Sequence, residues 1–379
     1  MNRRLGICYR FGLPAALRIE FGLFLLLLCA LAYAGEDSAH ADPGKRARTV
    51  KSRSPDLNGS AAETRLALNE LNPIVLAGLD APPKRAEIPD SKAALAVIYP
   101  DLPEPYRSIF AKIIEGIEEQ TKTKVSSYPI GPNSNLADLS GQLKRGGTKV
   151  VIALGRQGLK AASGLERDIS VVVGGVLSVP EGDSRNLTGI SLTPDPALLF
   201  ALLKKLLPGA KKVTVIYDPQ HNEWLLKLAR EAAKALGLEL VVHEAHDLAS
   251  AARLYEAAFA GADSRLDAVW LPQDATTVDE ETILPLVLKE SWNRGVPVFS
   301  SSFLHVKKGA LFALYPNNLG LGHDLASTAL SVLAGDSRKH GLSPLREVLT
   351  AINLRTASHV GLNIDYQQQR SFDFVFPEP

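Results

Sequence analysis

This chain of 379 residues contains few cysteines and has almost no net charge. Its two cysteines, Cys8 and Cys29, lie within the first thirty positions, so the rest of the chain has no thiol for a disulfide or a cysteine-ligated metal. A cysteine-free body suits an oxidising compartment. Lysine and arginine number 42 against 41 for aspartate and glutamate, which leaves a net charge of +1. Because no basic field covers the whole chain, we expect no nucleic-acid partner.

Motifs of the common enzyme classes are absent as well. The sequence contains no G-x-x-x-x-G-K-[ST] phosphate loop and no G-x-S-x-G nucleophile turn. Gly155-x-x-Gly158 is too short for the G-x-G-x-x-G dinucleotide fingerprint. The serines at 300–302 have His305 nearby, but a hydrolase would also need a positioned acid. The sequence therefore predicts a protein that is not an enzyme and that has no cofactor.

One histidine pair raises the question of a metal site. His243 and His246 are three residues apart, with Glu244 and Asp247 beside them. Such a pair binds a metal when both rings face one ion, but polar junctions between a strand and a helix also produce it by chance. We therefore predict no metal site here.

The first 34 residues have the features of a secretory signal peptide. An apolar run at 21–31 is too short for a comfortable membrane span, and Ala32-Tyr33-Ala34 is an A-x-A cleavage site before Gly35. The basic residues around the start of this segment are Arg3, Arg4, Arg10 and Arg18. An uncleaved anchor that leaves the protein facing the periplasm is the alternative, and a lipid on Cys29 ranks lower because Leu28 is large. We expect export to the periplasm.

Residues 35–90 predict a flexible tether between the signal peptide and the folded body. The part up to about residue 66 is rich in alanine, serine, aspartate, lysine and arginine. Such a composition cannot bury enough apolar surface to offset the entropy lost on ordering.

From residue 93 onward, apolar runs of strand length alternate with amphipathic stretches of helix length, which predicts an α/β fold. Most runs are apolar throughout, as in parallel strands buried on both faces. The clearest helix begins at Pro196, with Asp195 as its N-cap, and ends before Pro208-Gly209. The predicted strands are 93–99, 125–128, 149–154, 169–173 and 187–191, followed by 212–217, 238–242, 268–271, 296–300 and 310–314.

The two series of strands predict two lobes, because one sheet of ten strands is less common than two sheets of five. Their first strands are alike: residues 96–101 read AVIYPD and residues 214–219 read TVIYDP. We expect an N-terminal lobe at 91–190, a C-terminal lobe at 191–315, and a segment at 316–379 that crosses back between the lobes and ends in a tail.

Polar residues and glycines follow strand after strand, and ligands bind beyond the carboxyl ends of parallel strands. For any single residue, capping of the next helix is the simpler interpretation. The pattern across both lobes nevertheless predicts a ligand site. Its candidate residues are Tyr99, Gly155, Gln157, Gly175, Asp218, Gln220, Gln273, Asp274, Ser301, Ser302 and Tyr315.

From about residue 186 to 364 the chain resembles ABC-transporter substrate-binding proteins, in the family that includes binders of tryptophan and other aromatic amino acids. The segments that carry the resemblance are LTGIS at 187–191, LLPGAK at 206–211, VIYDP at 215–219, PVF at 297–299, KGA at 308–310, INLRTA at 352–357 and GLNI at 361–364. The resemblance implies the type I periplasmic-binding fold, a clamshell of two Rossmann-like lobes with parallel sheets. It also implies a small ligand held by hinge closure and an ABC permease as partner.

The sequence departs from the family at its ligand positions. The family has Asp-Asn-Thr after the third strand of the second lobe, where this chain has Asp274-Ala275-Thr276. Asp274 is therefore a candidate partner for a ligand ammonium group, or else a cap for the helix that follows it. An amino acid is one candidate ligand among small polar molecules. An envelope sensor or adaptor, which would serve a receptor kinase or an outer-membrane uptake system, is the alternative to import.

Overall fold

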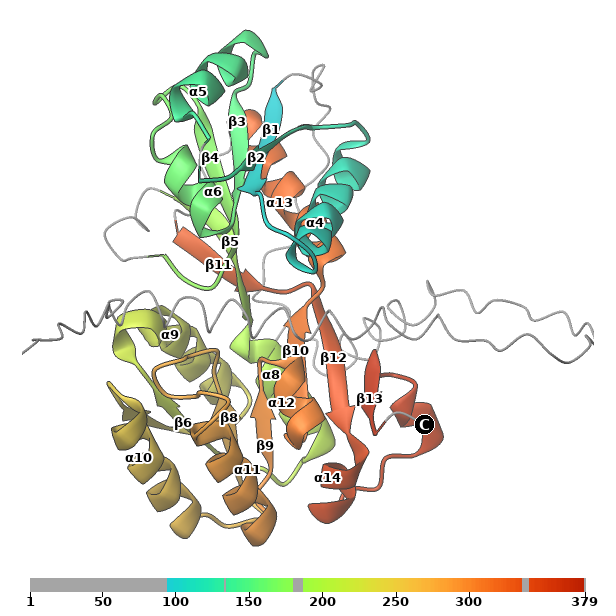
Figure 1. Ribbon diagram of the computed structural model, residues 1–379. Helices are drawn as coiled ribbons and strands as arrows, with labels where there is room; N and C mark the ends of the chain where they lie inside the picture. The colour runs from blue at the N-terminus through green and yellow to red at the C-terminus, as the bar shows by residue number, and fades with distance from the viewer. Residues whose placement is uncertain (1–93, 133, 180–186, 336–340, 378–379) are drawn as a thin grey trace, which may run out of the picture.

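The computed structural model describes residues 94–132, 134–179, 187–335 and 341–377, which form two α/β lobes, one above the other in Figure 1. The fold is mixed α/β with two mostly parallel sheets, as predicted. No helix within these residues is both long enough and apolar enough to cross a membrane. The predicted signal peptide and tether lie outside the described residues.

The first lobe is built on a sheet of parallel strands in the order β11-β5-β4-β3-β1-β2. Helices α4 (Tyr106–Thr121) and α13 (Asn318–Leu333) pack on one face of this sheet. The other face is covered by α5 (Leu136–Arg145) and α6 (Gly155–Ala162). The strands are β1 (Leu95–Pro100), β2 (Ser126–Ile130), β3 (Val150–Leu154), β4 (Ser170–Val176), β5 (Thr188–Pro194) and β11 (Gly341–Leu345).

The second lobe has the strand order β13-β12-β10-β9-β8-β6-β7, in which only the β10–β12 pair of the described strands is antiparallel. The strands are β6 (Lys212–Tyr217), β7 (Glu239–Glu244), β8 (Asp267–Leu271), β9 (Val298–Ser300), β10 (Phe312–Pro316), β12 (Val348–Asn353) and β13 (Phe374–Phe376). The helices are α8 (Pro196–Leu206), α9 (Pro219–Ala235), α10 (Leu248–Ala260), α11 (Ile283–Arg294), α12 (Phe303–Lys308), α14 (Leu354–His359) and α15 (Tyr366–Gln369).

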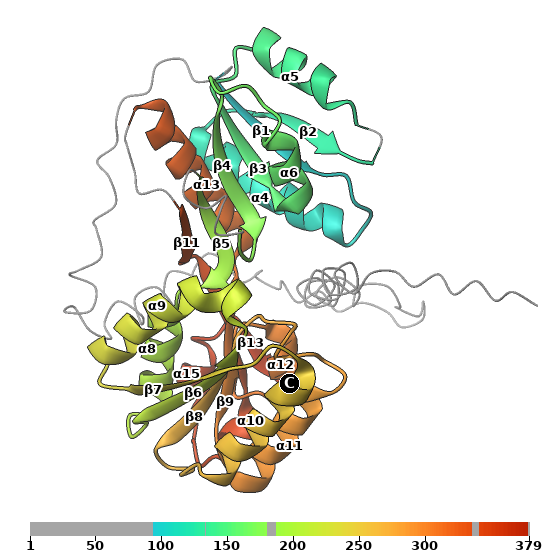
Figure 2. The same cartoon turned by 90° about the vertical axis from the view of Figure 1, so that its left-hand side faces the viewer.

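The chain passes between the lobes along three described segments, from β5 to α8, from β10 to α13 and from β11 to β12 (Figures 1 and 2). These segments are hydrogen-bonded to one another. The Asp195 amide donates to the Leu345 carbonyl at 2.9 Å, and the Asn317 amide donates to the Glu347 carbonyl at 3.1 Å. A bundle of a few linked crossings is the arrangement about which two rigid lobes can rotate.

Helices α4 and α13 approach each other unusually closely, although they are about 200 residues apart in the sequence (Figure 2). A Cβ atom added at Gly116 would lie 2.1 Å from the Leu319 carbonyl oxygen. One added at Gly322 would lie 2.2 Å from the Ile113 carbonyl oxygen. Only glycine fits at these two positions, so the crossing fixes the returning chain against the first lobe.

All ten predicted strands are confirmed, each within a few residues of its expected bounds. The helix at Pro196 is also confirmed: the Asp195 side chain accepts a hydrogen bond from the Ala197 amide, and the helix ends at Leu206. β11, β12 and β13 were not predicted individually. Residues 316–379, expected as a crossover and tail, supply α13 and β11 to the first lobe and β12, α14, α15 and β13 to the second.

Candidate functional site

The carboxyl ends of both sheets point toward the junction between the lobes. β5 leaves the first sheet toward the second lobe, and β10 leaves the second sheet toward the first (Figure 1). Apart from β12 and β13, which run the opposite way, the other strands of each sheet run in the same direction as β5 or β10. The turns after the strands, where polar residues gather in the sequence, therefore face each other across the junction, and this is where α/β folds bind ligands.

The carboxylate of Asp274, which follows β8, joins the end of β8 to the end of β6. Its Oδ2 accepts the Asp218 amide at 2.7 Å and the Asn222 side-chain amide at 2.9 Å. Its Oδ1 accepts the Thr276 amide at 3.0 Å. Asp218 in turn caps α9, because its side chain accepts the Gln220 amide at 3.0 Å.

These contacts place Asp274 in a structural role. The residue is 4% exposed, and both of its oxygens are occupied by groups of its own lobe. Burial raises the pKa of the Asp274 carboxyl, while the hydrogen bonds to it act in the opposite direction. The contact with the Thr276 amide lies within a turn rather than at a helix start, because the next helix, α11, begins only at Ile283. The contact of Asp274 with Asn222, 52 residues away, was not foreseen.

We expect Asp274→Ala to lower the free energy of unfolding by about 2 kcal/mol, because it leaves the buried Asp218 amide and Asn222 side chain without an acceptor. Asp274→Asn keeps one acceptor oxygen and should cost less. Urea denaturation of both variants measures the difference. If Asp274→Ala were as stable as the unmodified protein, Asp274 would not have the structural role described here.

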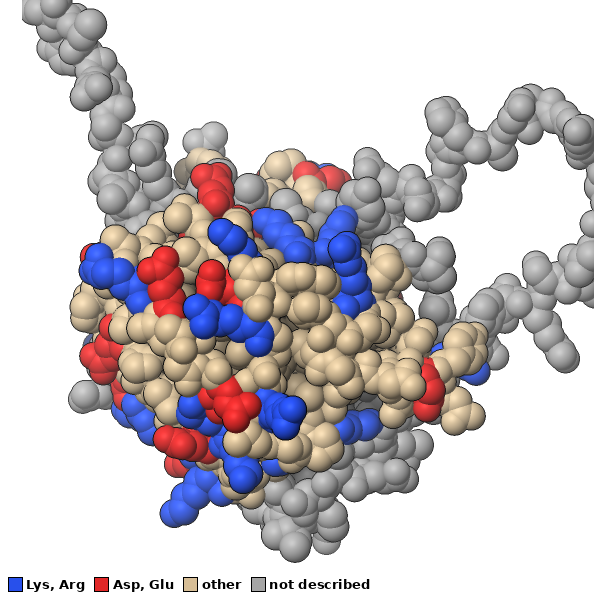
Figure 3. Space-filling model, turned by 90° about the horizontal axis from the view of Figure 1, so that it is seen from below, with Lys and Arg blue, Asp and Glu red and all other residues tan. Residues whose placement is uncertain are grey.

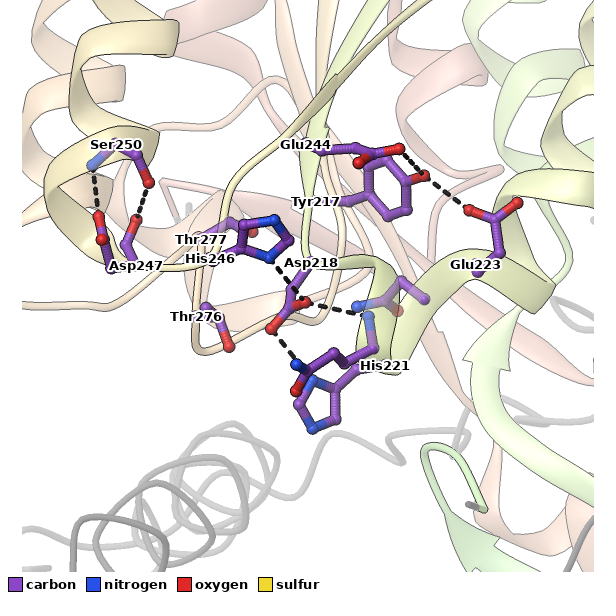
Figure 4. A network of polar contacts seen from close by, with 12 residues as sticks. Tyr217, Asp218, His221, Glu223, Glu244, His246, Asp247, Ser250, Thr276 and Thr277 are labelled. Carbon is purple, nitrogen blue, oxygen red and sulfur yellow. Dashed lines mark hydrogen bonds and ion pairs between the residues drawn. The ribbon is translucent and has the colours of Figure 1, made fainter. Parts of the chain in front are cut away.

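Two exposed histidines flank Asp218 (Figure 4). His221 Nδ1 lies 3.3 Å from one carboxylate oxygen, and His246 Nδ1 lies 3.8 Å from the other. The structure therefore brings His246 to Asp218 rather than to His243. Among the described residues, no group of three or more histidine, cysteine or acidic side chains is arranged to hold a metal ion.

A buried tyrosine lies behind this turn. The Tyr217 hydroxyl donates to Glu223 Oε2 at 2.7 Å and lies 3.4 Å from a Glu244 oxygen (Figure 4). Burial, together with the carboxylate of Glu223, raises the pKa of Tyr217 to about 12. The hydrogen bond from Tyr217 lowers the pKa of the Glu223 carboxyl. This network links Glu223, near the start of α9, to Glu244 at the end of β7.

A different set of residues presents unused hydrogen-bonding atoms. Gln273 Oε1, Ser301 Oγ and Asn318 Oδ1 are buried and have no hydrogen-bond partner among the described residues. They follow β8, β9 and β10, which are neighbours in the sheet. Buried polar atoms are nearly always hydrogen-bonded, so three on adjacent strand ends call for an external partner. With about 4.8 Å between strands, the row spans roughly 10 Å, the length of a small ligand.

Tyr315 also has an unpartnered buried hydroxyl, but it packs elsewhere. Its ring lies 5.2 Å from that of Phe303 and 6.3 Å from that of Phe374, on the α12 side of the sheet. Burial raises the pKa of Tyr315 well above its ordinary value. The structure therefore separates Tyr315 from the row formed by Gln273, Ser301 and Asn318.

The first-lobe candidates form a tight pair of turns. Gly155 and Gly175 have φ values of +68° and +69°, and a Cβ on Gly175 would lie 3.1 Å from the Gly155 amide nitrogen. Both positions therefore require glycine. Tyr99 is half-buried at the end of β1, with its ring 6.4 Å from that of Phe110. Gln157 is exposed in the first turn of α6.

The remaining candidates lie at helix starts in the second lobe. Gln220 is exposed in the first turn of α9, where its amide is held by Asp218. Ser302 precedes α12, and its amide donates to Ser300 Oγ at 3.1 Å. Ser300 Oγ also lies 2.7 Å from Nδ1 of the buried His305. Asn222 and Asn318 were not predicted as site residues, although both follow strands within five residues.

Comparison with known proteins agrees with this geometry. The family of ABC transporter substrate binding proteins matches residues 113–368, which is more than half of the chain. The chain belongs to this family. Proteins of this family bind small molecules, and they are typically periplasmic or extracellular partners of ABC permeases. No curated protein matches the sequence.

A solved structure of another substrate-binding protein shows the same fold. The ligand-free, open structure of a substrate binding protein with adhesive properties from Clostridium difficile is 16% identical, with a TM-score of 0.53 over 74% of this chain and 99% of that chain. An ABC domain in complex with L-Trp from Streptococcus pneumonia is 18% identical, with a TM-score of 0.47 over 75% of this chain and 99% of that chain. The predicted family and the type I periplasmic-binding fold are thus confirmed.

Proposed function

We propose that this substrate-binding protein captures a small polar ligand between its lobes and presents it to the permease of an ABC importer. The observation that carries the proposal is the row of unpartnered oxygens on Gln273, Ser301 and Asn318, at the edge of the second sheet that faces the first lobe. A ligand with hydrogen-bond donors would supply the missing hydrogen-bond partners of these oxygens. Closure of the first lobe, with its glycine turns at Gly155 and Gly175, would then shut out water.

The ligand is identified by a thermal-shift screen of amino acids, small acids and neutral hydroxylated molecules. A ligand at about 100 times its Kd adds about 2.7 kcal/mol to stability, which such a screen detects. Amino acids enter the screen first, because the sequence resembles binders of aromatic amino acids.

We expect Ser301→Ala to weaken the ligand found in this way by about ten-fold, the loss of one buried hydrogen bond, without changing the melting temperature of the free protein. Isothermal titration measures the affinity. Ser358→Ala, an exposed serine on α14, is the matched control and should bind as the unmodified protein does. An unchanged affinity in Ser301→Ala would remove this row from the ligand site.

The exterior of the second lobe is consistent with a protein partner of mixed charge. Figure 3 shows basic and acidic side chains interspersed over its lower face. A receptor kinase or an outer-membrane uptake system is the alternative partner to a permease, favoured by the long charged segment at 35–90. The neighbouring genes separate the two: a permease and an ATPase would indicate import, and a histidine kinase would indicate sensing.

Export is part of the same proposal. The A-x-A site at 32–34 is expected to be cleaved, so that the mature chain begins at Gly35. Intact-mass analysis of the exported protein should show the loss of residues 1–34. A full-length chain recovered from the membrane fraction would indicate an anchor instead.

A further inference from the structure

The second lobe contains a pocket that the proposed function does not use. It has a volume of about 140 Å³ and lies between the end of α8 and the segment that runs from β12 through α15 toward β13. α8 begins at the junction between the lobes, whereas the pocket is lined by Leu202 and Leu206 near its other end. At 1.5 Å per residue, these positions are roughly 10–16 Å along the helix from Asp195. The pocket is therefore separate from the row at the strand ends.

The walls of the pocket are mostly apolar. Leu202 and Phe372 belong to the core of the lobe, and Leu206, Leu362 and Ile364 pack against that core. A dry cavity of about 150 Å³ with leucine, isoleucine and phenylalanine walls is large enough for benzene. The volume and the walls thus suit one aromatic ring or a branched chain of similar size.

Most polar groups of the pocket are already engaged. Thr350 donates to the Asp373 carboxylate through its amide at 2.7 Å and through its hydroxyl at 2.9 Å. Gln368 Oε1 accepts the Asp365 amide at 2.9 Å. These hydrogen bonds lie within the segment from β12 to β13. The polar atoms that form them therefore do not require a ligand.

Lys205 is not held in this way. It lines the pocket, it is exposed, and none of the described acidic side chains forms an ion pair with it. The neighbouring Lys204 is held differently, because its Nζ donates to the Pro208 and Ala210 carbonyls, each at 2.9 Å. Lys205 therefore supplies a positive charge beside the apolar walls.

We propose that this pocket is a second ligand site, which takes a small carboxylate with an aromatic or branched apolar body and pairs its anionic group with Lys205. A molecule of benzoate size fits both the volume and the charge. The site is independent of the proposed function, since none of its residues belongs to the row formed by Gln273, Ser301 and Asn318.

Sodium benzoate is the probe, with neutral benzamide as its uncharged counterpart. Titration of the mature protein, followed by ligand-detected NMR, gives the Kd of each. We expect benzoate to bind about two- to five-fold more tightly than benzamide, the effect of one solvent-exposed ion pair. Lys205→Met should abolish the difference, and Lys234→Met, an exposed lysine on α9, should preserve it. Leu206→Trp, which fills the pocket, should abolish binding of both probes.

The thermal stability of each variant is measured alongside, so that loss of binding is separated from loss of the fold. Absence of benzoate binding at about 10 mM would overturn the proposal, as would binding that survives in a folded Leu206→Trp variant. Benzoate that binds between the lobes instead would be displaced by the ligand found in the screen and unaffected by Leu206→Trp. Neither result bears on capture of that ligand, which is measured separately.

Discussion

Gly322→Ala is expected to lower the free energy of unfolding by about 3 kcal/mol. The added Cβ would lie 2.2 Å from the Ile113 carbonyl oxygen and 2.9 Å from the Gly116 Cα, so α4 and α13 would have to separate along their contact. Neither neighbour is the flexible end of a side chain, and the backbone itself must move. Urea denaturation monitored by circular dichroism measures the loss.

Gly141→Ala provides the control, because it makes the same change in another helix. Its Cβ would meet only the end of the Arg145 side chain, at 3.4 Å. Alanine is a better helix former than glycine, so this variant should gain up to about 1 kcal/mol. If Gly322→Ala showed the same gain, the close crossing of α4 and α13 would not exist in solution.

His305→Asn is expected to flatten the pH dependence of stability below pH 6.5. Burial, and to a smaller extent the charge of Lys308, lowers the pKa of His305 from 6.5 to about 3. Between these values the unfolded chain binds a proton that the folded chain does not. Stability is therefore lost as the pH falls through this window, by up to about 1.4 kcal/mol per pH unit.

Between pH 6.5 and 4.5 the unmodified protein should lose about 2–3 kcal/mol more than His305→Asn does. Asparagine places an amide group near the position of Nδ1, which contacts Ser300 Oγ at 2.7 Å, and it does not titrate. Parallel curves for the unmodified protein and His305→Asn would mean that His305 titrates normally in the folded state.

The alternation of strands and helices could be predicted from the sequence because the parallel strands are apolar throughout. Segments such as Val150–Leu154 are buried at every position, and this leaves a continuous apolar run. The helix caps were readable for a similar reason, since Asp195-Pro196 is a local signal. β11 was harder to predict because its sequence GLSPL contains a proline and few buried residues, and β13 has only three residues.

Contacts between residues that are far apart in the sequence could not be predicted. Gly116 and Gly322 each look like an ordinary glycine within a helix, and only the crossing of α4 and α13 shows why each is needed. Asp274 was singled out correctly as a residue at a strand end. Its partners, Asp218 and Asn222, lie at the start of α9, after β6. These contacts form because β6 and β8 are neighbours in the sheet, and the sequence alone does not show the strand order.

The ligand-site residues depend on burial, which a single sequence does not reveal. Ser301 and Ser302 are neighbours of the same type, yet Ser301 has a buried, unpartnered hydroxyl and Ser302 is only half-buried. Asn318 was expected near a crossing between the lobes but not as a site residue. Together with Gln273 it shifts the proposed site from the turn at Asp218 toward the ends of β8, β9 and β10.

Closure of the two lobes on a ligand is the central claim, and a distance between the lobes tests it most directly. Residues 35–379 contain no cysteine, so in a chain that begins at Gly35 the substitutions Lys160→Cys on α6 and Lys227→Cys on α9 would carry the only two spin labels. Both positions are exposed, one on each lobe. Pulsed electron spin resonance should give a shorter mean distance with saturating ligand than without it. The same distance in both samples, with binding established by calorimetry, would contradict capture by closure.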